Sequence, residues 1–237
     1  MGRAIAITLH QEHVNNIMDT IARAEPATIE VARGWYKDWS VYLTHRAEVD
    51  GLPIDTAIVA FAWLSSNKSL DKNLYLFEQY IFNGARNVIG LSGVQRNKLL
   101  AIHMSGNPLQ FLTSPKVRSF AINLLANLEN VSDPYIEALV KRIRRQATKD
   151  QTVTIDRHAA QCAYNDRSIT RVPLWMYKTV SLAYQTVAAM LGWSAEEVQA
   201  VAWVQWRMEK KNSKGRTKGV ADPDARALLA WSAGVKA

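Results

Sequence analysis

The stretch IDTAIVAFAWLSS (54–66) places the strongest constraint on the fold, because nearly all of it is apolar. It follows a turn at GLP (51–53) and favours a helix. A helix that is apolar on most of its sides has to be buried on most of its sides. The rest of the chain must therefore supply elements that enclose it.

Helical periodicity dominates the remainder of the chain. Ser114 is a suitable N-cap with Pro115 as the first helical residue, and Ser194 with Glu197 forms a capping-box pattern. Asp133 stands near the start of another helix. Strand-like alternation is confined to AIAITL (4–9) and TVTI (152–155). We predict an all-α protein. The further helical segments are ATIEVARGWYKDWSVYLTHRAE, LDKNLYLFEQYIF, VQRNKLLAIHM, KVRSFAINLLANL, SDPYIEALVKRIRRQ, PLWMYKTVSLAYQTVAAMLG and SAEEVQAVAWVQWRMEKK.

Composition narrows the class of protein. The 237 residues suffice for one large domain or two smaller lobes, and 48% hydrophobic with 21% charged residues is ordinary for a globular protein. No apolar stretch has the roughly 18–20 residues of a membrane span, and the N-terminus lacks a long secretory apolar region. We expect a cytoplasmic protein.

Cysteine and histidine are scarce. Cys162 is the single cysteine, which excludes an intramolecular disulfide, a thiolate zinc site and an all-cysteine iron–sulfur cluster. Only His10 and His13 are close in sequence among the five histidines. We expect neither a metal site nor a cofactor.

The chain is basic, with a formal net charge of +8 and a pI near 9.6. Lys and Arg neutralise phosphates and release counterions, so this charge favours a nucleic-acid partner. The alternative is that the charge serves solubility alone.

The segment TVTIDRHA (152–159) ends a β-branched run in Asp156, Arg157 and His158 before the chain becomes helical again. A carboxylate at this junction is either a helix N-cap or a catalytic acid, and one residue can serve as both.

Four motifs in order, LSSN, IGLSGVQRNKLL, KVRSFAINLL and TIDRH, resemble the helix-hairpin-helix DNA glycosylase superfamily. The resemblance covers roughly residues 55–165. The TIDRHA ending and the later QAVAW (199–203) also resemble phage-type and antiphage-defence proteins. The resemblance implies two helical lobes with an interlobe cleft: a central lobe over 54–153, and a second lobe made of 1–53 and 154–237. We expect a flexible basic loop at 210–219 and a monomer.

The implied activity is hydrolysis of an N-glycosidic bond in duplex DNA after base flipping, without a cofactor, leaving an abasic site. Asp156 matches the catalytic aspartate, since a fixed carboxylate stabilises the positive charge that develops on the sugar. Bifunctional members use a lysine near the start of the helix after the hairpin. Arg118 and Ser119 match that region in one alignment and Lys116 in another, and arginine cannot act as the nucleophile. We therefore predict a monofunctional enzyme, with a damaged or a modified phage base as substrate.

The resemblance also assigns contacts to DNA and to the base. The predicted DNA-binding residues are Asn67, Lys116, Arg118, Ser119, Arg157 and His158, and the predicted base pocket comprises Trp35, Tyr36, Trp39 and Trp63. The alternative, purely structural roles are a helix C-cap for Asn67, packing for His158 and a core position for each aromatic residue. Trp203 and Trp206 are expected in the core.

The hairpin segment LTSPKVRS (112–119) departs from the family pattern because it contains no glycine. This departure favours a second hypothesis, a helical DNA-binding module without catalysis. A third hypothesis is base exchange on, or processing of, free nucleotides. KRIRR (141–145) either contacts the DNA backbone or forms a solvated helix end.

Overall fold

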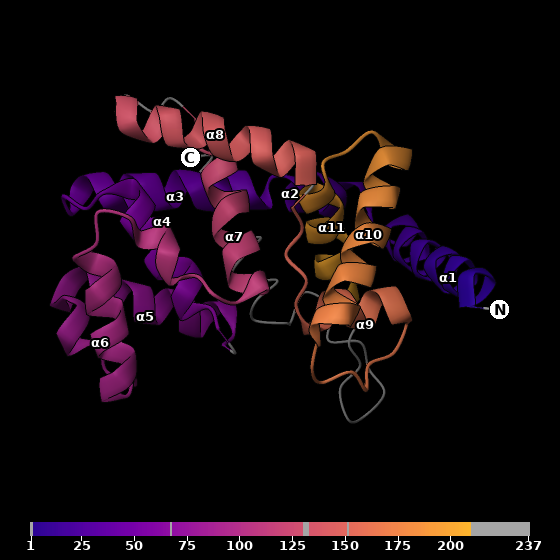
Figure 1. The fold of residues 1–237 in the computed structure, drawn as a ribbon, viewed down its shortest axis with the longest axis horizontal. Coiled ribbons are helices and arrows are strands. Elements are labelled where there is room, and N and C mark those ends of the chain that lie inside the picture. The colour runs from indigo at the N-terminus through magenta and orange to yellow at the C-terminus, as the bar shows by residue number, and fades with distance from the viewer. Residues whose placement is uncertain (1, 67, 130–132, 151, 210–237) are drawn as a thin grey trace. The chain divides into compact units, whose positions relative to one another are not determined.

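The computed structural model describes residues 2–66, 68–129, 133–150 and 152–209, with the side chains of 2–7 and 146–150 outside the description. Within these ranges the secondary structure is entirely helical, which confirms the prediction of an all-α protein (Figure 1). The α-helices are α1 (Gly2–Ala22), α2 (Pro26–Arg33), α3 (Trp35–Val49), α4 (Ile54–Leu64), α5 (Leu70–Asn83), α6 (Gly93–His103), α7 (Pro115–Ala126), α8 (Pro134–Asp150), α9 (Arg157–Tyr164), α10 (Leu174–Leu191) and α11 (Ala195–Met208), and the 3₁₀ helices are η1 (Ala85–Asn87) and η2 (Pro108–Phe111).

The two strand-like segments do not form strands. Residues 4–9 belong to α1, and residues 152–155 are extended without regular secondary structure. Tertiary context overrode the local β preference in both segments, because a strand is stable only when a neighbouring strand completes its hydrogen bonds.

Helix starts follow the sequence signals. Ser114 is the N-cap of α7 with Pro115 as its first residue, and Ser194 and Glu197 form the predicted capping box of α11. Asp133 Oδ1 accepts a hydrogen bond from Tyr135 N at 2.8 Å at the start of α8. These signals are local, so the sequence alone is enough to place them.

Contacts divide the chain into two compact units: unit 1 comprises Met1–Tyr36 with Thr148–Ala237, and unit 2 comprises Lys37–Ala147. These boundaries differ from those of the lobes drawn from the sequence, which stay a prediction. The predicted basic loop at 210–219 lies outside the described residues.

Unit 2 is built around α4. Helices α5, α6 and α7 and η2 all contact it, and Phe61 at its centre stacks on Trp39 with ring centroids 4.9 Å apart. The side chains from Ala57 to Ala62 have no exposed surface. The predicted enclosure of the apolar helix is confirmed.

In unit 1, α1 contacts α9, α10 and α11, and α2 contacts α11 (Figure 1). Ile17, Tyr184 and Val201 have no exposed surface and form part of this core. None of the helices in the described ranges combines the length and apolar character needed to cross a membrane.

One polar side chain lies deep in the core of unit 1. His13 is 1% exposed and its ring lies 4.1 Å from that of Tyr164, centroid to centroid. Neither ring nitrogen has a hydrogen-bond partner among the described residues. Burial lowers the pKa of His13 below its ordinary value of 6.5, because the charged imidazolium would lose its hydration.

This burial predicts an acid-sensitive fold. The unfolded chain binds a proton at His13 more readily than the folded chain, so stability falls as the pH drops below about 6.5. His13→Leu should weaken this acid dependence of the free energy of unfolding, measured by urea denaturation between pH 7.5 and pH 5. The matched control is His45→Gln at an exposed position, which should keep the wild-type dependence. An unchanged acid dependence in His13→Leu would contradict the prediction.

Candidate functional site

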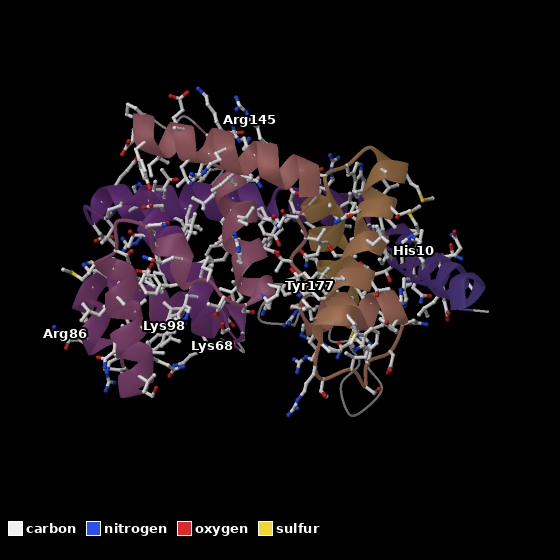
Figure 2. All side chains as sticks on the ribbon, in the orientation of Figure 1. His10, Lys68, Arg86, Lys98, Arg145 and Tyr177 are labelled. Carbon is white, nitrogen blue, oxygen red and sulfur yellow. The ribbon has the colours of Figure 1, made fainter. Side chains whose placement is uncertain are left out.

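Asp156 is delivered by the short extended segment 152–156. Val153 and Ile155 are each 1% exposed and anchor this segment in unit 1. The Tyr177 hydroxyl donates a hydrogen bond to Val153 O at 2.6 Å and accepts one from Ile155 N at 3.5 Å (Tyr177 is labelled in Figure 2). The backbone just before Asp156 is therefore held on both its carbonyl and its amide side.

The carboxylate of Asp156 binds two N–H groups. Oδ1 accepts a hydrogen bond from Ala159 N at 2.8 Å, which makes Asp156 the N-cap of α9. Oδ2 accepts a hydrogen bond from the indole Nε1 of Trp203 at 3.1 Å. The cap prediction is confirmed, and the side chain stays partly exposed. The catalytic role stays a prediction, and it is compatible with the cap.

Trp203 links Asp156 to an aromatic and cationic surface. The Arg207 guanidinium lies 4.8 Å from the centre of the Trp203 ring, and the Trp35 ring lies 6.2 Å from it. The expectation that Trp203 is a core residue was wrong, since it is partly exposed and donates to Asp156. Trp206 is 3% exposed, as expected. Helical spacing alone did not separate the two positions.

His158 belongs to a hydrogen-bonded network beside Asp156. Its Nε2 lies 3.4 Å from the Arg157 guanidinium, and its Nδ1 lies 3.0 Å from Gln161 Oε1. A neutral ring that donates from Nδ1 satisfies both contacts. Burial lowers the pKa of His158, and the Arg207 charge acts in the same direction, against the opposing charge of Asp156. His158 is partly exposed and Arg157 is exposed, and their contacts with DNA stay a prediction.

Gln161 extends this network by hydrogen bonds to the segment after α9 and to α11. Its amide donates to Arg167 O at 3.1 Å and to Ile169 O at 2.8 Å, and it accepts a hydrogen bond from the Trp206 indole at 3.4 Å. The Arg167 guanidinium lies 3.9 Å from the centre of the Trp206 ring. Two tryptophans of α11, Trp203 and Trp206, thus each have an arginine over the ring.

The four predicted base-pocket residues are divided between the two units, and their gathering into one pocket stays a prediction. Trp35 packs edge-on against Tyr36 in unit 1, with ring centroids 4.8 Å apart, and Tyr36 is a core residue whose hydroxyl donates to Gln199. Trp39 is buried in unit 2, and Trp63 is partly exposed on α4 of the same unit. Trp35 is the member that lies next to Trp203 and, through it, to Asp156.

The predicted DNA contacts near the hairpin belong to unit 2. Lys116 and Ser119 are partly exposed and Arg118 is exposed, all in the first turns of α7. Residues 112–118 contain no positive φ angle, so the left-handed turn of the family pattern is absent from this segment. Asn67 lies outside the described residues.

The side chains of KRIRR (141–145) have different environments. The Arg144 guanidinium donates to Ala126 O at 2.8 Å and to Leu128 O, which ties α8 to the end of α7. Ile143 is buried, and Lys141 pairs with Glu137. Arg142 and Arg145 are exposed. At most part of this segment is available to a partner.

The match to a protein-family model covers most of the chain. A family model matches residues 3–210, a range that includes Asp156 and Trp203. The chain belongs to DUF7178. This is a family of unknown function. A search of curated proteins and a search of solved structures each returned no match.

Unit 2 of this DUF7178 member contains a pocket of about 440 Å³. None of the residues predicted from the sequence lines it. Its lining includes four carboxylates and neither Lys nor Arg: Glu48, Asp55, Glu129 and Asp133. Burial raises the pKa of Asp55, and the charge of Asp133 adds to the effect. An acidic lining disfavours a phosphate, so this pocket does not suit the DNA backbone.

The contacts of Asp156 predict a measurable structural role in this DUF7178 member. Asp156→Ala should lower the free energy of unfolding by about 1–3 kcal/mol, because it removes a helix cap and leaves the Trp203 indole without its acceptor. Urea denaturation of Asp156→Ala, Trp203→Phe and the double variant should give a coupling energy of about 0.5–3 kcal/mol.

The exposed Asp166 in the turn after α9 provides the matched control, because its carboxylate bonds Ser168 rather than a helix end or an indole. Asp166→Ala should show no coupling to Trp203→Phe. Additive effects of Asp156→Ala and Trp203→Phe would contradict the bonding described above.

Proposed function

We propose that this chain is a DNA glycosylase that flips a damaged or modified base out of duplex DNA and hydrolyses its N-glycosidic bond. The observation that carries the proposal is the partly exposed Asp156 carboxylate, which is fixed by Ala159 N and by the Nε1 of Trp203, whose ring lies 6.2 Å from the Trp35 ring. Asp156 stabilises the positive charge that develops on the sugar or orients the attacking water. No cofactor enters this chemistry.

The binding of Asp156 supports this role physically. Hydrogen bonds from Ala159 N and Trp203 Nε1 hold the carboxylate in place. They also fix its direction, so the charge needs no reorganisation when the sugar becomes positive. The Tyr177 contacts hold the preceding backbone in the same way.

The surroundings of Asp156 suit a nucleotide. Aromatic rings such as those of Trp35 and Trp203 provide surfaces on which a base stacks. Arg157 is exposed next to Asp156, and Arg207 lies against the Trp203 ring. Guanidinium groups bind phosphate through two parallel hydrogen bonds, and the net charge of +8 favours a polyanion. A two-lobed helix-hairpin-helix fold, a monomeric state, a cytoplasmic location and a role in antiphage defence belong to the same proposal.

The proposal predicts that Asp156→Asn abolishes abasic-site formation and leaves DNA binding within about threefold of wild type. Asparagine keeps the size of the side chain but removes the charge that the sugar cation needs, a loss expected to exceed about 10²-fold in rate. Unmodified phage genomes and genomes with hypermodified cytosine serve as substrates. Alkaline cleavage detects abasic sites, and mass spectrometry identifies the released base.

Asp166→Asn, at an exposed carboxylate in the same unit, is the matched control and should keep full activity. Base release by Asp156→Asn at the wild-type rate would overturn the assignment of Asp156. The absence of base release by the wild-type protein from every substrate would overturn the glycosylase proposal.

The second candidate function is a helical DNA-binding module without catalysis. One observation favours it: both oxygens of Asp156 already have structural partners. The glycine-free segment 112–119 points the same way. Wild-type protein that retards duplex DNA but releases no base from modified or unmodified substrates would support this candidate over the first.

A further inference from the structure

Two lysines meet at the start of α5, in unit 2. Lys68 immediately precedes the N-cap Ser69, and Lys72 lies in the first turn of the helix. Burial lowers the pKa of Lys68, and the charge of Lys72 lowers it further, so the two ammonium groups repel each other. A cation in the first turn is also disfavoured by the helix dipole. This arrangement costs free energy in the absence of an anion.

No ion pair with a described residue neutralises either lysine. The ion pairs among the described residues involve other lysines and arginines, so no described carboxylate lies within 4 Å of the ammonium group of Lys68 or Lys72. Lys68 Nζ instead donates to Ser66 O at 3.2 Å, and Lys72 Nζ lies 4.4 Å from the centre of the Tyr75 ring. The two lysines keep donors for an external acceptor.

The loop before α6 brings a glycine to the same place. A Cβ on Gly90 would lie 3.7 Å from Lys72 Nζ, so the backbone of this loop passes close to the ammonium group. Gly90 has φ +90°, a conformation that residues with side chains rarely adopt. The turn thus places exposed backbone beside a cation, a combination that suits a phosphate.

Exposed apolar side chains lie close to these groups in the sequence. Tyr75 is 46% exposed, Ile89 is 67% exposed and Val94 at the start of α6 is 80% exposed. Proteins that bind nucleic acids combine cations for the backbone with aromatic and aliphatic groups for the sugars and bases. The neighbouring side chains therefore fit the same partner as the lysines.

We propose that Lys68, Lys72 and the turn at Gly90 form a contact surface for the phosphate backbone of duplex DNA (Lys68 is labelled in Figure 2). The inference rests on the proposed function for the identity of its partner. It gives the chain a phosphate contact with a glycine turn, which the segment 112–119 lacks. The acidic pocket of the same unit is excluded from this role by its charge.

The test is a salt titration of DNA binding with the full chain. Fluorescence anisotropy measures the affinity for a labelled duplex at about 50 to 200 mM salt. Lys68→Gln/Lys72→Gln should weaken binding at least about tenfold and should reduce the slope of log affinity against log salt by about 1.8, because each lost phosphate contact removes about 0.9. Lys68→Arg/Lys72→Arg keeps both charges and should restore most of the affinity.

The matched control removes two other positive charges of unit 2. Lys37 and Lys141 are paired with Glu129 and Glu137, so Lys37→Gln/Lys141→Gln changes the net charge equally and should leave the slope within about 0.5 of wild type. Thermal unfolding confirms that each variant is folded. Equal slopes for wild type and Lys68→Gln/Lys72→Gln would overturn the proposed surface, as would wild-type protein that does not bind duplex DNA.

Base release separates this inference from the proposed function. If the wild-type protein releases no base but its DNA affinity falls in Lys68→Gln/Lys72→Gln, the surface stands and the glycosylase proposal fails. If base is released and the double variant binds DNA like the wild type, the surface fails and the glycosylase proposal stands.

Discussion

The carboxylate of Asp156 is the interaction on which the described site depends, because it joins three elements of unit 1. It ends the extended segment 152–156, caps α9 through Ala159 N and holds α11 through the Trp203 indole. The contact also fixes the Trp203 indole, whose ring lies near the Trp35 ring and the Arg207 guanidinium. Loss of one hydrogen-bond partner here would disturb the cap of α9, the orientation of the Trp203 ring and the position of the carboxylate charge together.

The structural and catalytic roles of Asp156 do not exclude each other. A cap needs an acceptor at a helix N-terminus, and a glycosylase needs a fixed negative charge near the sugar. N–H donors serve both requirements, since they complete the helix cap and fix the direction of the carboxylate. Asp156 is partly exposed.

Charge is distributed unevenly within unit 2. One region holds four carboxylates around a pocket of about 440 Å³, whereas the start of α5 holds two lysines that form no ion pair with a described residue. A polyanion would be attracted to the lysines and repelled by the carboxylates, because Coulomb energy changes sign between the two regions. In the proposal made above, the nucleic-acid partner that the net charge of +8 led us to expect contacts the lysines at the start of α5.

The sequence by itself determined most of the helices, several of their caps and the burial of α4, because period, capping residues and apolar content act locally. It also singled out Asp156 at a helix start. It did not predict the first part of α1, which reads as strand-like. Only the tertiary structure decided that Trp203 donates to Asp156, that Trp39 packs on Phe61, and that Lys72 lies beside Gly90. These pairs are separated by 47, 22 and 18 positions (203 − 156, 61 − 39 and 90 − 72). Contacts across such separations depend on how helices pack, and a residue's own neighbours in the chain carry no record of that packing.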